Sequence, residues 1–398
     1  METWSAHQLF TTAERSIGKS AAYALQSYAQ SLEAKKLPVV FTLRHLSTIT
    51  GVSYRVLHQT VNRKREACNY RMYAIKKRSG GRRIIHSVCE DLIRVQDFVN
   101  REILQRCQPH PASFAFHSSG GIKECASMHC GARWVFQFDL SDFFYDVTEI
   151  DVYRIFDDLG YRSLLAFELA RLCTTTKLPR HLKHLLYHCA NPDNLIQDFE
   201  DDFEKPGNGV RRLPYPERHG VVGVLPQGAP TSPMLSNLAA RRMDELLQSF
   251  AFDSGFVYTR YADDLTFSAA RLQDKHGVCS VRREVIGLIR KSGFKENSKK
   301  SRIAGPGSKK VVLGLLVDGD TPRISRETYR RIDRLLYGAL QNGFESASAF
   351  NKFDSALGFY NHLGGLIAFV KSVDEKRWSE FSNRMRGIEQ KWGDFGDI

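Results

Sequence analysis

The chain has 398 residues, of which 42% are hydrophobic and 25% charged, a composition typical of a globular protein with two or three subdomains. Its formal net charge of +13 favours a polyanionic partner, most often nucleic acid, although some globular proteins are basic without one. Because the sequence has no signal peptide, no apolar run of the roughly 18–20 residues that span a bilayer, and no C-x-x-C pair among its eight cysteines, we expect a cytoplasmic protein with reduced thiols and no membrane partner.

The N-terminal third is expected to contain helices and one hairpin. Residues 5–66 look mostly helical, and 70–88 reads as two strands flanking a Gly-Gly turn. A helix follows, with apolar residues at helical spacing from Leu92 to Leu104. Basic residues lie on both sides of this turn and suit either an anionic ligand or a solvated basic turn.

The middle of the chain begins with a strand in which apolar and polar positions alternate. In residues 133–147, Trp134, Phe136 and Phe138 share one face, and Asp139 belongs to the other. A single helix is expected over 149–172. Residues 174–222 are irregular and rich in Pro and Gly, which predicts an insertion or a long loop.

The remaining elements are a loop and helix, a hairpin, a strand and a helical end. The loop and helix occupy 225–247, the hairpin 255–269 and the strand 311–317. Three helices are expected after this strand, at about 325–342, 346–363 and 372–391.

Three carboxylates on two of the predicted strand regions indicate a metal site. Asp139 lies in one strand region, and Asp263 and Asp264 lie in the hairpin. If these strands are neighbours in one antiparallel sheet, the carboxylates converge and offer the oxygen ligands that Mg²⁺ prefers. Two such ions can activate a 3′-hydroxyl and stabilise the leaving oxygen of a phosphoryl transfer. For the Asp-Asp pair alone, the competing reading is an ordinary wet turn.

The order of motifs resembles that of a known enzyme family. "FDLSDFF", "LPQGAPTSP" and "YADD" follow one another, and together they resemble the palm motifs of reverse transcriptases. The resemblance implies an α+β fold with the right-hand architecture of a polymerase. It divides the chain into N-terminal helices and fingers (1–130), a palm with the insertion or long loop at 174–222 (131–321), and a helical, RNA-binding thumb (322–398).

The same resemblance assigns roles to individual residues. It implies that Asp139, Asp263 and Asp264 are the catalytic metal ligands, with the carbonyl of Leu140 as a further ligand. The cofactor would be two Mg²⁺ ions, with Mn²⁺ as an alternative. The residues implied to bind the incoming dNTP are Lys77, Arg83, Phe144 (a steric gate against ribonucleotides), Gln227 and Lys300 (a proton donor to pyrophosphate).

Within that family, the chain is most similar to the retron type. "CASMH" stands where retron enzymes carry N-A-x-x-H, which places His129 ten residues before Asp139 and Cys125 in place of the asparagine. The V-T-G element reads Val-Leu-Gly here, with Leu313 in place of the threonine. The residues expected to bind RNA are His129, Arg326, Arg330, Arg331 and Arg334.

The retron resemblance implies a function and partners. The enzyme would copy part of a cognate structured non-coding RNA, primed by a 2′-hydroxyl of that RNA, into a branched RNA–DNA hybrid called msDNA. The system would act in antiphage defence with a separate effector protein. Two alternatives stay open at this point: another defence-associated reverse transcriptase with different priming, and a non-catalytic RNA-binding scaffold.

Overall fold

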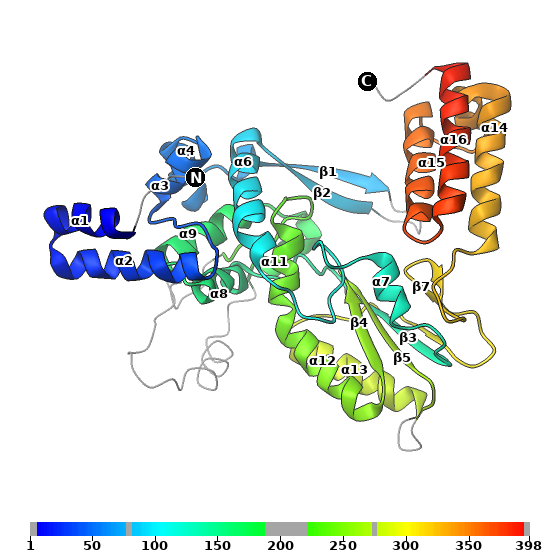
Figure 1. Ribbon diagram of the computed structural model, residues 1–398, viewed down its shortest axis with the longest axis horizontal. Coiled ribbons are helices and arrows are strands. Elements are labelled where there is room, and N and C mark those ends of the chain that lie inside the picture. The colour runs from blue at the N-terminus through cyan, green and yellow to red at the C-terminus, as the bar shows by residue number, and fades with distance from the viewer. Residues whose placement is uncertain (1–5, 77–81, 188–220, 273–276, 394–398) are drawn as a thin grey trace. The chain divides into compact units, whose positions relative to one another are not determined.

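The computed structural model describes residues 6–76, 82–187, 221–272 and 277–393 (Figure 1). The chain divides into two compact units. The first unit draws on residues 1–111, 140–245 and 286–295, and the second on residues 112–139, 246–285 and 296–398. Helices are combined with antiparallel sheets, so the α+β prediction is confirmed. Within the described residues, no helix has both the length and the apolar character needed to cross a membrane.

The first unit begins with short helices and the expected hairpin. The helices are α1 (Ala6–Ile17), α2 (Lys19–Ala34), α3 (Leu43–Thr50), α4 (Tyr54–Val61) and α5 (Glu66–Asn69). Strands β1 (Tyr70–Lys76) and β2 (Arg82–Val88) pair antiparallel in full register, from Tyr70 opposite Val88 to Lys76 opposite Arg82. The chain continues through α6 (Glu90–Phe98) and the short turns η1 (Val99–Ile103) and η2 (Leu104–Arg106).

The prediction of a single helix over 149–172 is wrong, because the structure has two helices there. Helix α8 (Glu149–Leu159) starts at a capping box between Thr148 and Asp151, and it ends at Gly160. Gly160 has φ +105°, a left-handed conformation that glycine adopts readily at the end of a helix. The rest of the unit contains α9 (Ser163–Cys173), η3 (Arg180–Tyr187), α11 (Ser232–Ala239) and the start of α12 (Arg241–Ser254). Of the predicted loop at 174–222, residues 188–220 lie outside the described part.

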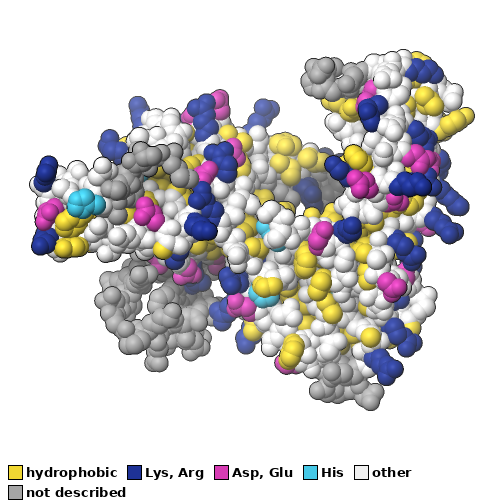
Figure 2. Space-filling model, viewed as in Figure 1, with side chains coloured by type: hydrophobic (Ala, Val, Ile, Leu, Met, Phe, Trp, Pro, Cys, Tyr) yellow, Lys and Arg dark blue, Asp and Glu magenta, His cyan; other side chains and the backbone are white. Residues whose placement is uncertain are grey.

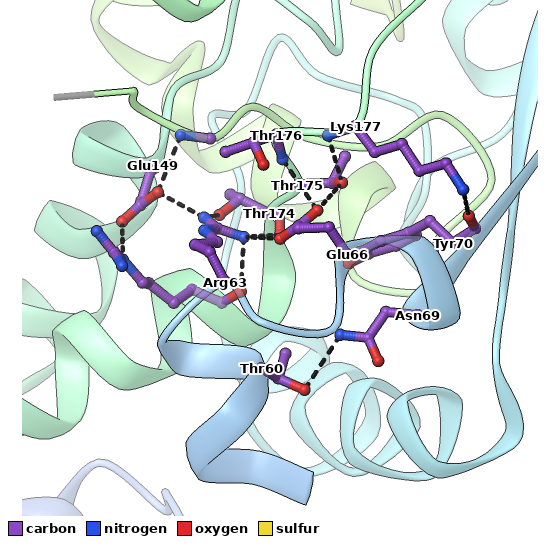
Figure 3. A network of polar contacts seen from close by, with 12 residues as sticks. Thr60, Arg63, Glu66, Asn69, Tyr70, Glu149, Thr174, Thr175, Thr176 and Lys177 are labelled. Atoms are coloured by element: carbon purple, nitrogen blue, oxygen red, sulfur yellow. Dashed lines mark hydrogen bonds and ion pairs between the residues drawn. The ribbon is translucent and has the colours of Figure 1, made fainter.

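A polar network joins the helices of the first unit (Figure 3). The guanidinium of Arg63, after α4, donates to Glu149 at 2.5 Å and to Glu66 at 2.9 Å. Arg171 donates to the second oxygen of Glu149 at 2.7 Å. Burial alone would raise the pKa of Glu149, but the charges of Arg63 and Arg171 outweigh it and lower the pKa. The buried carboxylate therefore stays ionised with two arginines around it.

The same network reaches the base of the hairpin. Glu66 accepts a hydrogen bond from the hydroxyl of Thr175 at 2.5 Å. Two residues later, the ammonium of Lys177 donates to the backbone oxygen of Tyr70, the first residue of β1, at 2.5 Å. The backbone oxygen of Lys177 also lies 2.9 Å from Nε2 of His86 in β2. Both hairpin strands are thus anchored to the segment after α9.

The second unit is built around a four-stranded antiparallel sheet with strand order β4-β5-β3-β6 (Figure 1). The strands are β3 (Trp134–Asp139), β4 (Val257–Tyr261), β5 (Asp264–Ala269) and β6 (Arg302–Ala304). Helix α7 (Ile122–Ser127) precedes β3, and α13 (Val278–Lys291) follows β5. The predicted strand at the start of 133–147 and the predicted hairpin at 255–269 are confirmed.

The C-terminal part of the second unit has three helices, as expected, although their ends differ from the prediction. They are α14 (Arg326–Phe350), α15 (Ala356–Lys371) and α16 (Glu375–Trp392). Their apolar sides form one core in which Ile332, Phe359 and Phe381 are fully buried. The single strand expected at 311–317 is wrong, because β7 (Val311–Val312) and β8 (Leu315–Leu316) form a tight hairpin there. Its turn residues Leu313 and Gly314 have φ +49° and +84°.

Candidate active site

The four-stranded sheet presents one aromatic face and one polar face. Phe138 and Phe267 are buried on the aromatic face, with their rings edge to face and 5.9 Å apart. On β3, Asp139 belongs to the opposite face, as the alternation of the strand requires. Asp139 is paired directly with Asp264 of β5, and paired residues on neighbouring strands share a face. The sheet thus brings together two carboxylates that lie far apart in the sequence.

Asp263 lies in the turn that follows β4. Since Tyr261 pairs with Asp264, the turn consists of Ala262 and Asp263 alone. Ala262 has φ +56°, a left-handed conformation that costs a non-glycine residue about 1 kcal/mol or more. This strained two-residue turn sets Asp263, the first aspartate of "DD", at the end of the sheet, next to Asp264.

Asp139 is held by two side chains from the loop before β6. Nζ of Lys300 donates to Oδ1 of Asp139 at 2.7 Å, and Nδ2 of Asn297 donates to Oδ2 at 3.0 Å. The backbone N–H of Asn297 also donates to the backbone oxygen of Asp139, at 2.7 Å. The carboxylate is buried, whereas the Lys300 side chain is half-exposed. Asp139 is therefore fixed in place before any ligand arrives.

The charges at this end of the sheet influence one another. Removal from water raises the pKa of Asp264 to about 6, with further contributions from the negative charges of Asp263 and Asp139, although Lys300 opposes the rise. The pKa of Lys300 is raised by its hydrogen bond to Asp139 and by the charges of all three carboxylates. These mutual effects show that the three aspartates and the lysine form one electrostatic cluster.

The cluster has the donor chemistry for Mg²⁺, although it does not form a complete coordination shell. Carboxylate oxygens are the hard ligands that this cation prefers, and a dication would relieve the repulsion that raises the pKa of Asp264. Across the described residues, no three His, Cys, Asp or Glu side chains are grouped as a ready metal site. Lys300 donates to Oδ1 of Asp139, so a cation that uses this oxygen must share it with the ammonium group or displace that group.

Comparisons of the sequence with known proteins show which family the chain resembles. Residues 75–317 match the sequence profile described as "reverse transcriptase (RNA-dependent DNA polymerase)". The chain is 31% identical over 389 residues to the retron Mx65 reverse transcriptase of Myxococcus xanthus, covering 97% of this chain and 81% of that protein. It is 28% identical over 359 residues to the retron Ec86 reverse transcriptase of Escherichia coli, covering 90% and 92%. The chain belongs to the reverse transcriptases of the retron type. The enzyme is accordingly an RNA-directed DNA polymerase.

The residues expected to bind the incoming nucleotide belong to both units of the enzyme. Arg83, Phe144 and Gln227 lie in the first unit, whereas Lys300 lies in the second with the aspartates. Lys77 lies outside the described residues. Leu140, whose carbonyl is the expected further metal ligand, is buried and begins the next segment of the first unit. Only Lys300 is therefore brought next to the aspartates by the described contacts.

Phe144 and Gln227 are both partly exposed. Phe143 is buried against Phe294, whereas Phe144 is only half-buried. Phe143 therefore packs in the core, and the ring of Phe144 is the accessible one. The backbone oxygen of Gln227 accepts from the N–H of His86 at 2.7 Å. A Cβ at Gly228, which has φ +114°, would lie 2.7 Å from the backbone oxygen of His86. Glycine is required there for the loop to lie against β2.

The residues expected to bind RNA differ in accessibility. Arg326, Arg330, Arg331 and Arg334 are exposed on α14, and Arg331 lies 3.0 Å from Nε2 of His362 on α15. The space-filling view shows Lys and Arg side chains gathered on the side of the three-helix segment where α14 lies (Figure 2). His129 is fully buried instead. In this conformation its ring cannot touch RNA, so direct RNA contact by His129 is not what the structure shows.

Two residues at the aspartate end escaped the sequence analysis. Asn297 bonds to Asp139, which lies 158 residues earlier in the sequence. The sequence around it, "ENSKK", indicates only a turn. Ala262 carries the left-handed turn, where pattern reasoning expects Gly or Asn. The sequence pattern shows neither the distant partner of Asn297 nor the left-handed backbone of Ala262.

Proposed function

We propose that the enzyme is the polymerase of a retron. It reverse transcribes part of a cognate structured non-coding RNA, primed by a 2′-hydroxyl of that RNA, and forms the branched RNA–DNA hybrid msDNA. We place this activity in antiphage defence, together with a separate effector protein. The observation that carries the proposal is the pairing of Asp139 with Asp264 beside Asp263, in a chain that is similar to retron reverse transcriptases over most of its length.

Phosphoryl transfer is assigned to the aspartate cluster. Asp139, Asp263 and Asp264 would hold two Mg²⁺ ions, with the carbonyl of Leu140 as a further ligand and Mn²⁺ as an alternative metal. When bound, the two cations activate the primer hydroxyl and stabilise the leaving oxygen. Asn297 orients Asp139 through its amide group. Lys300, once released from Asp139, donates a proton from Nζ to the departing pyrophosphate.

Selection of the nucleotide is assigned to the first unit. The accessible ring of Phe144 would exclude a ribose 2′-hydroxyl, and Gln227 would lie beside the nucleotide and the template. Arg83, together with Lys77, would neutralise the triphosphate. The contacts of Lys177 with both strands of the β1–β2 hairpin support this assignment, because they fix the end of the hairpin from which the basic residues extend.

The parts of the chain are assigned to a right-hand polymerase. Residues 1–130 would form the N-terminal helices and fingers, 131–321 the palm, and 322–398 the thumb. On the thumb, Arg326, Arg330 and Arg334 follow one another at intervals of four residues, which places them on one side of α14. Exposed guanidinium groups at this spacing suit the phosphates of a structured RNA more than its bases.

The test is the nucleic acid that copurifies with the enzyme when it is expressed with its native flanking DNA. It is analysed on denaturing gels with and without RNase and debranching enzyme, for wild type and the Asp263→Asn/Asp264→Asn variant. We expect one DNA species that is linked to RNA, shifts on debranching and is absent from the variant. Unbranched or heterogeneous DNA would contradict the retron function and leave a reverse transcriptase with different priming.

A further inference from the structure

His129 makes a buried contact with both strands of the hairpin that carries Asp263 and Asp264. The residue lies just after α7, and its ring is fully buried. Nε2 is 2.7 Å from the hydroxyl of Thr259 in β4, and Nδ1 is 2.7 Å from the hydroxyl of Ser268 in β5. Cys125 of α7 adds a contact of 3.3 Å from its sulfur to the same Thr259 hydroxyl.

The two hydroxyls lie on the face of the sheet that carries the aspartates. Thr259 pairs with Thr266, which lies two residues after Asp264 on the same side of β5, and Ser268 lies two residues further. Thr259 and Ser268 are therefore diagonal neighbours on adjacent strands, and the imidazole bridges them. A shift of β4 by one residue would turn Thr259 to the opposite face. A shift by two residues would move it about 7 Å along the strand. The bridge forms only in the observed register.

The β4–β5 hairpin has two features that the bridge would stabilise, a strained turn and an edge strand. Its two-residue turn contains Ala262 in a left-handed conformation, and strained conformations persist only where the surroundings hold them. β4 is the edge strand of the sheet. Beyond β5, its backbone partners are Ala112 and Phe114, which bond to Arg260 at 2.7 and 2.8 Å. His129 holds β4 from the face of the sheet, where these backbone bonds do not act.

We propose that His129 is a positioning residue that locks the β4–β5 hairpin in the register that sets Asp264 opposite Asp139. The inference rests on the proposed function of the aspartates in binding the catalytic cations. Burial lowers the pKa of His129 to about 4, so the ring is neutral near pH 7. A neutral imidazole offers one donor and one acceptor, which the two hydroxyls satisfy because a hydroxyl can play either part.

The test compares Thr259→Val, which keeps the shape of the side chain and removes the hydroxyl, with Thr259→Ser, which keeps the hydroxyl. Primer extension is measured against dNTP and Mg²⁺ concentration, and RNA affinity is measured separately. We expect Thr259→Val to lower kcat roughly ten- to hundredfold, because small misplacements of catalytic groups have effects of this size. It should also raise the half-saturating Mg²⁺ concentration, with unchanged KM for dNTP and unchanged RNA affinity. Thr259→Ser should restore both values.

One control variant and a second pair of variants make the outcome decisive. Ile388→Ala, in the buried core of α16, should lower stability and leave the Mg²⁺ requirement unchanged. If Thr259→Val does not fold, Ser268→Ala and Ser268→Thr provide the same contrast on β5. Wild-type kinetics in Thr259→Val, or a selective loss of RNA affinity, would overturn the inference while the proposed function stands. Wild-type enzyme without Mg²⁺-dependent incorporation would overturn the proposed function and the inference with it.

Discussion

Two clusters of charged side chains in this enzyme are organised in opposite ways. In the first unit, the carboxylate of Glu149 is completely buried and lies between Arg63 and Arg171. In the second unit, Asp139, Asp263 and Asp264 influence one another electrostatically, and Lys300 bonds to Asp139. Arginines surround the carboxylate of the first cluster, whereas carboxylates of the second cluster repel one another.

The pKa values report this difference. Although burial acts to raise both, the pKa of Glu149 is lowered because two arginines surround it. The pKa of Asp264 is raised to about 6 because burial and the neighbouring carboxylates act in the same direction. A cation bound between carboxylates relieves repulsion of this kind. This difference supports a stabilising role for the first cluster and the proposed metal-dependent chemistry for the second.

The largest expected effect is on activity, from Asp264→Asn. The change keeps the shape of the side chain and removes a charged ligand, so polymerisation should fall by about 10³-fold or more. Because the change also removes repulsion, the free energy of unfolding without Mg²⁺ should stay the same or rise. Primer extension and chemical unfolding measure the two quantities. Loss of activity together with loss of stability would contradict the separation of roles.

The converse effect is expected from Glu149→Gln. Two arginines would lose a buried counter-charge, and breaking a buried ion pair typically costs about 3–5 kcal/mol of stability. At a temperature where the variant is folded, its polymerase activity per folded molecule should be close to that of wild type. The matched control is Glu90→Gln, which breaks an exposed pair with Arg94 and should change the unfolding free energy by less than about 0.5 kcal/mol. Equal effects of the two changes would refute the structural role of Glu149.

Lys300→Met is expected to have two smaller effects, one on the Mg²⁺ requirement and one on the maximal rate. Without the ammonium on Oδ1 of Asp139, the half-saturating Mg²⁺ concentration should decrease because a competitor is lost. The maximal rate should fall by about 10²-fold if Lys300 is the proton donor. Lys299→Met, at the exposed neighbouring lysine, is the control and should change neither value. A rise in the Mg²⁺ requirement of Lys300→Met would show that the lysine supports the site rather than competing for it.

The smallest expected effect is the pH dependence of stability without metal. The pKa of Asp264 is raised in the folded state, so its contribution favours folding at low pH and is lost as pH rises from about 4 through about 6. The pKa of Glu149 is lowered, so its contribution is present above its unfolded pKa and is lost as pH falls below it. Unfolding of wild type and Asp264→Asn at pH 5 and pH 7 isolates the first contribution. Parallel behaviour of the two proteins would contradict it.

Much of the aspartate end was predictable because it depends on short-range patterns. The alternation of β3 predicts which face carries Asp139, and two adjacent strand-forming runs predict the hairpin. The order of "FDLSDFF", "LPQGAPTSP" and "YADD" then indicates the family without any knowledge of the contacts.

The features that sequence reasoning missed depend on distant contacts or unusual backbone conformations. Gly160 ends a helix that periodicity alone continues, and Leu313 adopts a left-handed turn inside an apolar run. Arg63 meets Glu149 across 86 residues. His129 was expected to contact RNA because a motif position does not show whether a ring is exposed or buried between two strands.

The central claim is that the three aspartates bind the catalytic cations, and the most direct test is to count Mn²⁺ ions bound with dNTP present. Electron paramagnetic resonance would quantify free and bound Mn²⁺ for wild type, Asp263→Asn/Asp264→Asn and Glu149→Gln. The account predicts two ions per wild-type protein, two for Glu149→Gln under folded conditions, and loss of protein-dependent binding in the double aspartate variant. Equal binding by wild type and the double variant would contradict it.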